Sequence, residues 1–329
     1  MMKQEFHRVS RHHNFSRPRL RATPASFAAA LLAVLTSSIA LISNTAFMSS
    51  AAAADFSLPA LNSPPSAEHH AGKMVWADLV TPDLAAAEKF YGALFGWTFQ
   101  SARAGNSEYA VAMLDGRPIA GVLQKAIPSG EHHQSAWLTF LAASDVDSVK
   151  KIALAHGAKV LGGDRNYPMR GQQCVLSDPE GAVFALLASS SGDPPDYLPV
   201  AGEWIWSSLH AKDAGAEAGF YQQLFNYDVF EAPSDDGLEH LILSSDNYAR
   251  ASANDLERDS KHRRSHWLNF VRVNSAAETA AKVSALGGRV LVEPRPDRHG
   301  GMLAVVADPA GAPFGLMEWS DSDSKEEPK

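Results

Sequence analysis

The sequence lacks the features that mark two large classes of protein. Cys174 is the one cysteine among 329 residues, so no disulfide can form within the chain and a disulfide scaffold is excluded. Positive charge is not in surplus either, because 29 lysines and arginines face 37 acidic residues, for a formal net charge of −8. An acidic surface repels phosphate backbones, and nucleic acid is therefore not an expected partner. The length suits two domains rather than one.

Charge is missing from one long stretch near the amino terminus. Six basic residues within positions 3–21 precede an uncharged apolar run over 27–48, and an alanine run ends at Ala54. This order predicts an export signal over residues 1–54 and a periplasmic or secreted protein without stable membrane association after cleavage. An uncleaved membrane anchor is the alternative, because the apolar run is long enough to span a bilayer. Removing six basic residues and one acidic residue leaves a net charge of −13.

Two patterns are each present twice, 130 residues apart. The stretch "AEKFYGALFGW" (87–97) is matched by "EAGFYQQLFNY" (217–227), and "DPEGAVFALL" at Asp178 by "DPAGAPFGLM" at Asp308. An Asp-Pro-x-Gly sequence suits a tight turn, because proline presets φ and glycine accepts the awkward last position. The fixed spacing indicates a tandem duplication.

Each copy contains the order strand, helix, three strands twice over. In the first unit an apolar strand over 74–81 precedes a helix that Asp83 caps, and three short strands follow within 97–124. Proline-, serine- and alanine-rich stretches separate the copies. The expected organisation is an export signal (1–54), a linker (55–72), a first module (73–189), a second linker (190–203), a second module (204–320) and a charged tail (321–329).

The repeated helix ending "FYxxLF" and the repeated hairpin "DPxGxxF" together resemble the vicinal oxygen chelate superfamily. That group includes glyoxalases, bleomycin-resistance proteins and extradiol dioxygenases, and the resemblance covers residues 73–320. It implies an α+β fold in which two βαβββ units pair and curl their sheet into a half-open barrel, or cup. Four units can complete two cups in one chain, so we expect a monomer, with a dimer as the alternative.

The resemblance also implies where a divalent metal would bind. Metal-dependent members use His or Gln on the first strand, His on the fifth and Glu on the eighth. The matching positions here are Trp76 and Trp206, then Trp137 or Leu138 and Trp267 or Leu268, then Ala185 and Gly315. None of these side chains can coordinate a metal. We therefore expect no cofactor at the usual place.

Strand alternation predicts what the cups contain instead. Trp76 and Asp78 are expected in the first cup, and Trp206, Ser208 and His210 in the second. Trp137 and Trp267 are expected to form the opposite walls. Such a lining suits an aromatic or apolar small molecule. The alternatives are that the tryptophans merely fill the cups and that Asp78 bonds a neighbouring strand.

An enzyme is the competing hypothesis. A lyase or dioxygenase would need a relocated divalent metal, and His210, His266 and Glu318 are the candidate ligands. The sequence assigns no catalytic residue. The second module is favoured as the active one, because Ser208 and His210 make its cup the more polar.

Overall fold

The computed structural model describes residues 58–104, 107–127, 135–234, 236–256, 264–297 and 300–319. The predicted export signal and the charged tail lie outside these residues. The helices of the described part are α2 (Leu84–Phe95), α3 (Val146–Ala155), α4 (Ala214–Phe225) and α5 (Ala276–Ala285). None of these helices is long and apolar enough to cross a bilayer.

Each module forms one eight-stranded mixed sheet. In spatial order the first sheet is β2 (Thr98–Ala104), β3 (Ser107–Leu114), β4 (Arg117–Gln124), β1 (Met74–Thr81), β5 (Ala136–Ala142), β8 (Val183–Ser189), β7 (Gly171–Ser177) and β6 (Lys159–Tyr167). The second is β10 (Asp228–Glu231), β11 (His240–Ser245), β12 (Tyr248–Asp255), β9 (Trp204–Ala211), β13 (His266–Val273), β16 (Pro313–Glu318), β15 (Met302–Ala307) and β14 (Arg289–Pro296). The identical order confirms the duplicated α+β fold.

The βαβββ units join through their first strands. β1 pairs antiparallel with β5 and parallel with β4, and β9 pairs in the same way with β13 and β12. The two units of a module thus share one sheet that is not closed. One face of each sheet carries the helices, and the other forms the cup.

Local sequence fixes where the long helices begin and end. Asp83 and Asp213 each accept a hydrogen bond from a backbone amide three residues later, which caps α2 and α4. Gly96 ends α2 at φ 77°, and Asn226 ends α4 at φ 55°. Glycine and asparagine are the residues that most readily adopt this left-handed conformation.

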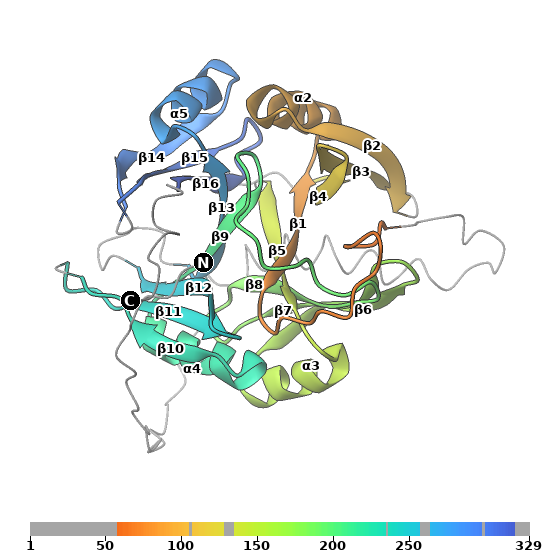
Figure 1. Ribbon diagram of the computed structural model, residues 1–329, viewed down its shortest axis with the longest axis vertical. Helices are drawn as coiled ribbons and strands as arrows, with labels where there is room; N and C mark the ends of the chain where they lie inside the picture. Colours follow the sequence, from red (N-terminus) through yellow and green to blue (C-terminus); the bar gives the residue numbers. More distant parts are fainter. Residues whose placement is uncertain are drawn as a thin grey trace, which may run out of the picture.

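The two modules pack against each other through the faces of their sheets that carry the helices, and the apolar cores there contain residues of both modules. Figure 1 shows α2 beside α5 and α3 beside α4, each pair combining one helix from each module. Two apolar clusters span this boundary, one around Tyr91 and Phe314 and one around Phe184 and Tyr221. The repeated aromatic pattern therefore builds the contact between modules, so that each module buries its helix face against the other.

Residues 58–72 do not form a free linker. Leu58 and Leu61 are buried in the cup of the first module. The second linker crosses the boundary between the modules, and Figure 1 shows it running in front of β9.

Candidate ligand-binding sites

The cup of the first module is filled by its own side chains. Trp76 donates to Asp78 Oδ1 from Nε1 at 2.8 Å, and the Tyr109 hydroxyl donates to the same oxygen at 2.8 Å. Burial raises the pKa of Asp78, whereas the nearby Arg170 charge and these two donors oppose the rise. Gly121 leaves room for this contact, because a Cβ there would overlap both Asp78 and Tyr109. Of the two roles expected for Asp78, the structure shows the hydrogen-bonded one, but the partners are Trp76 on the same strand and Tyr109 on β3, with β4 lying between β3 and β1.

Arg170 closes the same cup. Its side chain is fully buried, with Cζ 3.8 Å from the centre of the Trp76 ring. Its Nε donates to the carbonyl of Pro59 at 2.7 Å. Leu58 and Leu61 complete the filling, and Trp76 keeps an exposed fraction of only 3%. Among the described residues, the interior of the first cup is thus filled by the protein's own side chains, and Trp76 and Leu61 also border the space between the modules.

The cup of the second module is more open and has a polar wall. Trp206 Nε1 donates to Ser252 Oγ at 3.1 Å, and Ser252 Oγ donates to Ser208 Oγ at 3.0 Å. Asn254 Nδ2 donates to Ser208 Oγ at 2.7 Å, and its Oδ1 lies 2.8 Å from Nδ1 of His240. Trp206 stays partly exposed, unlike its counterpart Trp76. Ser208 and Ser252 are buried in this row, whereas Trp206 and Asn254 beside them are partly exposed.

His210 lies on the same wall. Its ring stacks on that of His266, with centres 5.2 Å apart and planes 15° apart. Nε2 of His210 is sealed from solvent and has no hydrogen-bond partner among the described residues. Burial, with a smaller contribution from His266, lowers the pKa of His210 to about 3. The imidazole is therefore neutral at physiological pH.

Trp137 and Trp267 do not line the cups, contrary to the expected placement. They lie on the helix face, where their Nε1 atoms donate to the hydroxyls of Tyr91 and Tyr221 at 3.0 and 2.8 Å. The cup-facing residues of β5 and β13 are instead Leu138 and Leu268 with their i+2 neighbours. The sheet irregularity lies at the far end of the β1–β5 pair, between Met74 and Trp76, and so does not shift Trp137.

Aromatic side chains instead gather in a cleft between the modules. The cleft has a volume of about 730 Å³ and runs beneath residues 194–199 of the second linker. Its aromatic lining residues are Trp76, Trp204, Trp206, Trp319, Tyr197 and Tyr248. Trp206 and Trp319 also belong to the apolar cluster of the second cup, so cleft and cup adjoin. The sequence pointed to Trp76 and Trp206 but missed the others, since tertiary packing brings a linker and two strand ends together.

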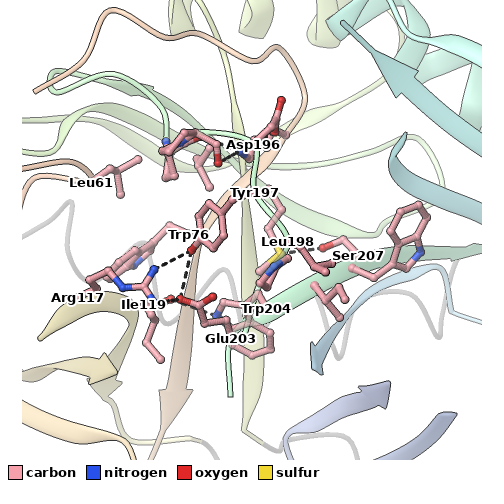
Figure 2. A pocket seen from close by; sticks show the side chains of 18 of the residues that line it. Leu61, Trp76, Arg117, Ile119, Asp196, Tyr197, Leu198, Glu203, Trp204 and Ser207 are labelled. Carbon is pink, nitrogen blue, oxygen red and sulfur yellow. Dashed lines mark hydrogen bonds and ion pairs between the residues drawn. The ribbon is translucent and has the colours of Figure 1, made fainter. Parts of the chain in front are cut away.

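Charged groups around the cleft are paired with one another. Figure 2 shows Arg117, Tyr197 and Glu203 joined at one end, where Arg117 Nη2 lies 2.6 Å from Glu203 Oε1 and the Tyr197 hydroxyl donates to the same oxygen at 3.2 Å. Asp196 pairs with Lys73 at 2.8 Å and with Arg250 at 2.6 Å. The lining therefore has little unneutralised charge to offer, which favours uncharged ligands.

Comparison with known proteins assigns a family. The sequence profile described as "Glyoxalase-like domain" matches residues 74–187 and 206–317. The chain belongs to the glyoxalase-like domain family. The duplication and the four βαβββ units place it within the vicinal oxygen chelate superfamily, as the sequence resemblance implied.

Relatives of this glyoxalase-like chain include two kinds of named protein. It is 29% identical over 266 residues to "Putative glyoxylase CFP32" of Mycobacterium tuberculosis (strain CDC 1551 / Oshkosh), covering 78% of this chain and 98% of the relative. It is 28% identical over 262 residues to "Anthracycline biosynthesis protein DauV" of Streptomyces sp. (strain C5), covering 75% and 93%.

Solved structures share the fold. A Mn(II)-bound glyoxalase from Novosphingobium aromaticivorans aligns with a TM-score of 0.52 at 14% identity, over 76% of this chain and 83% of the other. The 2,3-dioxygenase LapB from Pseudomonas sp. KL28 aligns with a TM-score of 0.53 at 13% identity, over 77% and 94%. At such identities the likeness concerns architecture alone.

The metal positions expected for this superfamily do not fit a metal in this glyoxalase-like chain. Trp76, Leu138 and Ala185 line the first cup, and their equivalents in the second module are Trp206, Leu268 and Gly315. None offers a lone pair suited to a divalent ion. No cluster of three His, Cys, Asp or Glu residues with metal-binding geometry occurs in the part of the chain that the structure describes.

The relocated triad is not assembled either. His210 and His266 are cross-strand neighbours, as expected. Glu318, however, pairs with Val273 at the opposite end of β13, and its Oε1 accepts a hydrogen bond from the Ala276 amide at the start of α5. Seven residues of extended strand separate His266 from that end, more than 20 Å at about 3.3 Å per residue. Glu318 therefore cannot share a metal with the two histidines.

Proposed function

We propose that this protein binds a planar, largely apolar and uncharged small molecule in the cleft between its modules and the adjoining second cup, without a resident metal. The observation that carries the proposal is the cleft itself, about 730 Å³ and lined by four indole and two phenol rings. That volume lies within the range of small-molecule sites, and such sites are mainly apolar with a few polar groups that orient the ligand.

The second module supplies the orienting groups. Ser208, Ser252 and Asn254 form a hydrogen-bonded row next to Trp206, and the first cup has no comparable open wall. A keto or hydroxyl substituent on the ligand would exchange hydrogen bonds with this row. Two relatives carry names in anthracycline biosynthesis, and anthracyclines are planar polycyclic compounds with such substituents, which supports the choice of probe.

The site of action is part of the proposal. The amino-terminal pattern supports export, so the ligand would be met in the periplasm or outside the cell. No partner other than a small molecule is proposed, and the protein acts as a monomer. Binding would sequester or carry the compound rather than transform it.

Binding of a dihydroxyanthraquinone tests the proposal. Titration of the mature protein should quench tryptophan fluorescence and raise the melting temperature. Trp206→Leu should weaken binding about tenfold, since one stacked aromatic ring contributes about 0.5–1.5 kcal/mol beyond its buried area and the smaller side chain also buries less of the ligand. Leu291→Ala, at a half-exposed residue of the edge strand β14, is the control and should bind as the wild type does. Equal affinity of the Trp206 variant would remove the cleft from consideration.

Metal analysis addresses the competing enzyme hypothesis. Mature protein incubated with zinc, manganese, nickel or iron and then desalted should retain far less than one ion per chain, because the superfamily ligand positions lack donor atoms. His210→Ala should leave this residual content unchanged. Retention of one ion per chain that is lost in the His210 variant would contradict the metal-free proposal.

A further inference from the structure

The described chain begins with a short segment that lies across the cup of the first module. Leu58 and Leu61 insert into it, with exposed fractions of 4% and 8%. They belong to the same apolar cluster as Trp76, Phe140 and the other side chains of the cup wall. The cup therefore receives two side chains, three positions apart, from a segment outside the sheet.

Polar contacts hold the backbone of this segment. Arg170 Nε donates to the Pro59 carbonyl at 2.7 Å. The amides of Leu61 and Asn62 donate to Ser191 Oγ at 3.0 and 3.1 Å. Asn62 Nδ2 donates in turn to the carbonyls of Gly192 at 2.9 Å and Asp193 at 2.8 Å. Backbone contacts that give affinity, combined with pockets for particular side chains, are a common way for proteins to recognise short peptide segments.

The cup wall suits this occupant. Trp76, Leu138 and Ala185 stand at the three positions where the superfamily places metal ligands, and all three join the cluster that buries the leucines. Ala185 leaves space that a glutamate would fill. Gly192 permits a close approach of the segment, since a Cβ there would overlap Ser66. The positions that hold metal ligands in other members of the superfamily thus form part of an apolar socket in this chain.

In the part of the chain that the structure describes, no segment inserts into the second cup in this way. The linker that precedes it carries Leu198 and Val200, whose exposed fractions are 39% and 46%. The linker lines the cleft between the modules instead of entering the second cup. Among the described residues, then, only the first cup receives a connecting segment, so the insertion of residues 58–62 is not a general result of connecting the modules.

We propose that the first cup is a binding site for a short peptide with two leucines three positions apart, and that its resident ligand is the chain's own segment 58–62. The segment follows directly after the expected export signal, so the mature amino terminus would close the cup as the protein folds. This proposal does not depend on the small-molecule function of the cleft.

A cleavable chain tests the proposal. A protease recognition sequence inserted between Ala67 and Glu68, both exposed, allows the folded mature protein to be cut. After cutting, the wild-type segment should remain attached through gel filtration. In the Leu58→Asp, Leu61→Asp double variant it should dissociate and leave a folded protein with an empty cup, as checked by circular dichroism.

The emptied protein is then titrated with fluorescent peptides covering residues 55–66. The peptide of wild-type sequence should bind at least tenfold more tightly than one with both leucines changed to aspartate, and the uncut wild-type protein should bind neither. Loss of the wild-type segment on cutting would overturn the proposal, as would equal binding of the two peptides. Unfolding of the emptied protein would also overturn it, because the segment would then be core rather than ligand.

Hydrogen exchange of the uncut protein gives an independent readout. The amides of Leu61 and Asn62 should be protected, because both donate to Ser191 Oγ. Ser191→Ala should accelerate exchange at these two amides at least tenfold while leaving the amides of β5 unchanged. Rapid exchange in the wild type would contradict a bound segment.

Discussion

Two cup-facing polar residues on equivalent strands illustrate how neighbours decide the chemistry of a side chain. Asp78 is buried but receives hydrogen bonds from Trp76 and Tyr109, so it is a satisfied acceptor. His210 is held against His266, and its Nε2 has no partner among the described residues. A buried imidazole without a counter-charge disfavours protonation, which explains its lowered pKa. His210 can therefore offer a neutral acceptor or donor to a ligand but not a positive charge.

The lowered pKa of His210 predicts an acid-sensitive contribution to stability. Between its folded pKa of about 3 and the ordinary value of 6.5, the unfolded chain binds a proton that the folded protein refuses. Stability is therefore lost as the pH falls through this window. His210→Gln should lose about 1–3 kcal/mol less than the wild type between pH 7 and pH 4, measured by urea unfolding. His156→Gln, at the exposed end of α3, is the control, and identical pH profiles for wild type and His210→Gln would contradict the assignment.

At the scale of secondary-structure elements, the two copies of the aromatic helix differ in one buried carboxyl. Glu217 of α4 interacts with Asp178 of the first module's turn, and the equivalent residue of α2 is Ala87. Burial, and then the charge of Asp178, raise the pKa of Glu217 above its ordinary value of 4.5. The junction of α4 with the first module thus holds a protonated carboxyl next to an acceptor, whereas the junction of α2 is apolar at this point.

The carboxyl pair predicts the opposite pH dependence from that of His210. Above pH 4.5 the unfolded chain has released the Glu217 proton, whereas the folded protein retains it, so stability falls as the pH rises. Glu217→Gln removes the cost of keeping this carboxyl protonated and should stabilise the protein by about 1–2 kcal/mol at pH 8, with a smaller gain at pH 5. Urea unfolding at both pH values measures the difference. A gain independent of pH would show that packing, not ionisation, is responsible.

At the scale of the whole molecule, two crossed contacts hold the modules together. The Tyr91 hydroxyl donates to Asp308 Oδ2 at 3.2 Å, and the Tyr221 hydroxyl donates to Asp178 Oδ2 at 3.1 Å. Each contact joins the helix of one module to the Asp-Pro-x-Gly turn of the other. The two motifs that repeat at a spacing of 130 residues are therefore the two halves of one interface, formed twice.

Removal of one hydroxyl should weaken this interface. Tyr221→Phe deletes the donor to Asp178 and the acceptor for Trp267, and leaves two buried polar groups without that partner. We expect a loss of about 2–3 kcal/mol in the free energy of unfolding, measured with urea at pH 7. Tyr91→Phe should lower the free energy of unfolding by a similar amount, because the Tyr91 hydroxyl makes the equivalent pair of contacts. Tyr248→Phe, in the cleft, is the control and should lower it little. A loss below about 0.5 kcal/mol for Tyr221→Phe would contradict this role.

Sequence reasoning located the elements well because their signals are local. Asp83 caps its helix as expected and Asp213 caps the equivalent helix, and the alternation along β1 and β9 placed Trp76 and Trp206 toward the cups. The prediction for Trp137 was wrong. The face of the sheet on which a strand residue lies depends on the pairing register, and a shift of one residue moves the side chain to the opposite face. The predicted metal site at Glu318 was wrong for another reason. β13 and β16 run parallel, so His266 at the start of β13 and Glu318 at the end of β16 lie at opposite ends of the pair.

The sequence by itself determined the duplication, the order of strands and helices, and which residue types stand at the superfamily's metal-ligand positions, because these follow from repeats, short-range preferences and residue identity. Only the tertiary structure decided which cup is filled and where the aromatic rings gather. Both depend on contacts between segments far apart in the chain, such as Leu61 with Ser191 and Trp204 with Ile119. Burial of an apolar side chain is favourable against any apolar partner, so the sequence does not specify which segments pack together.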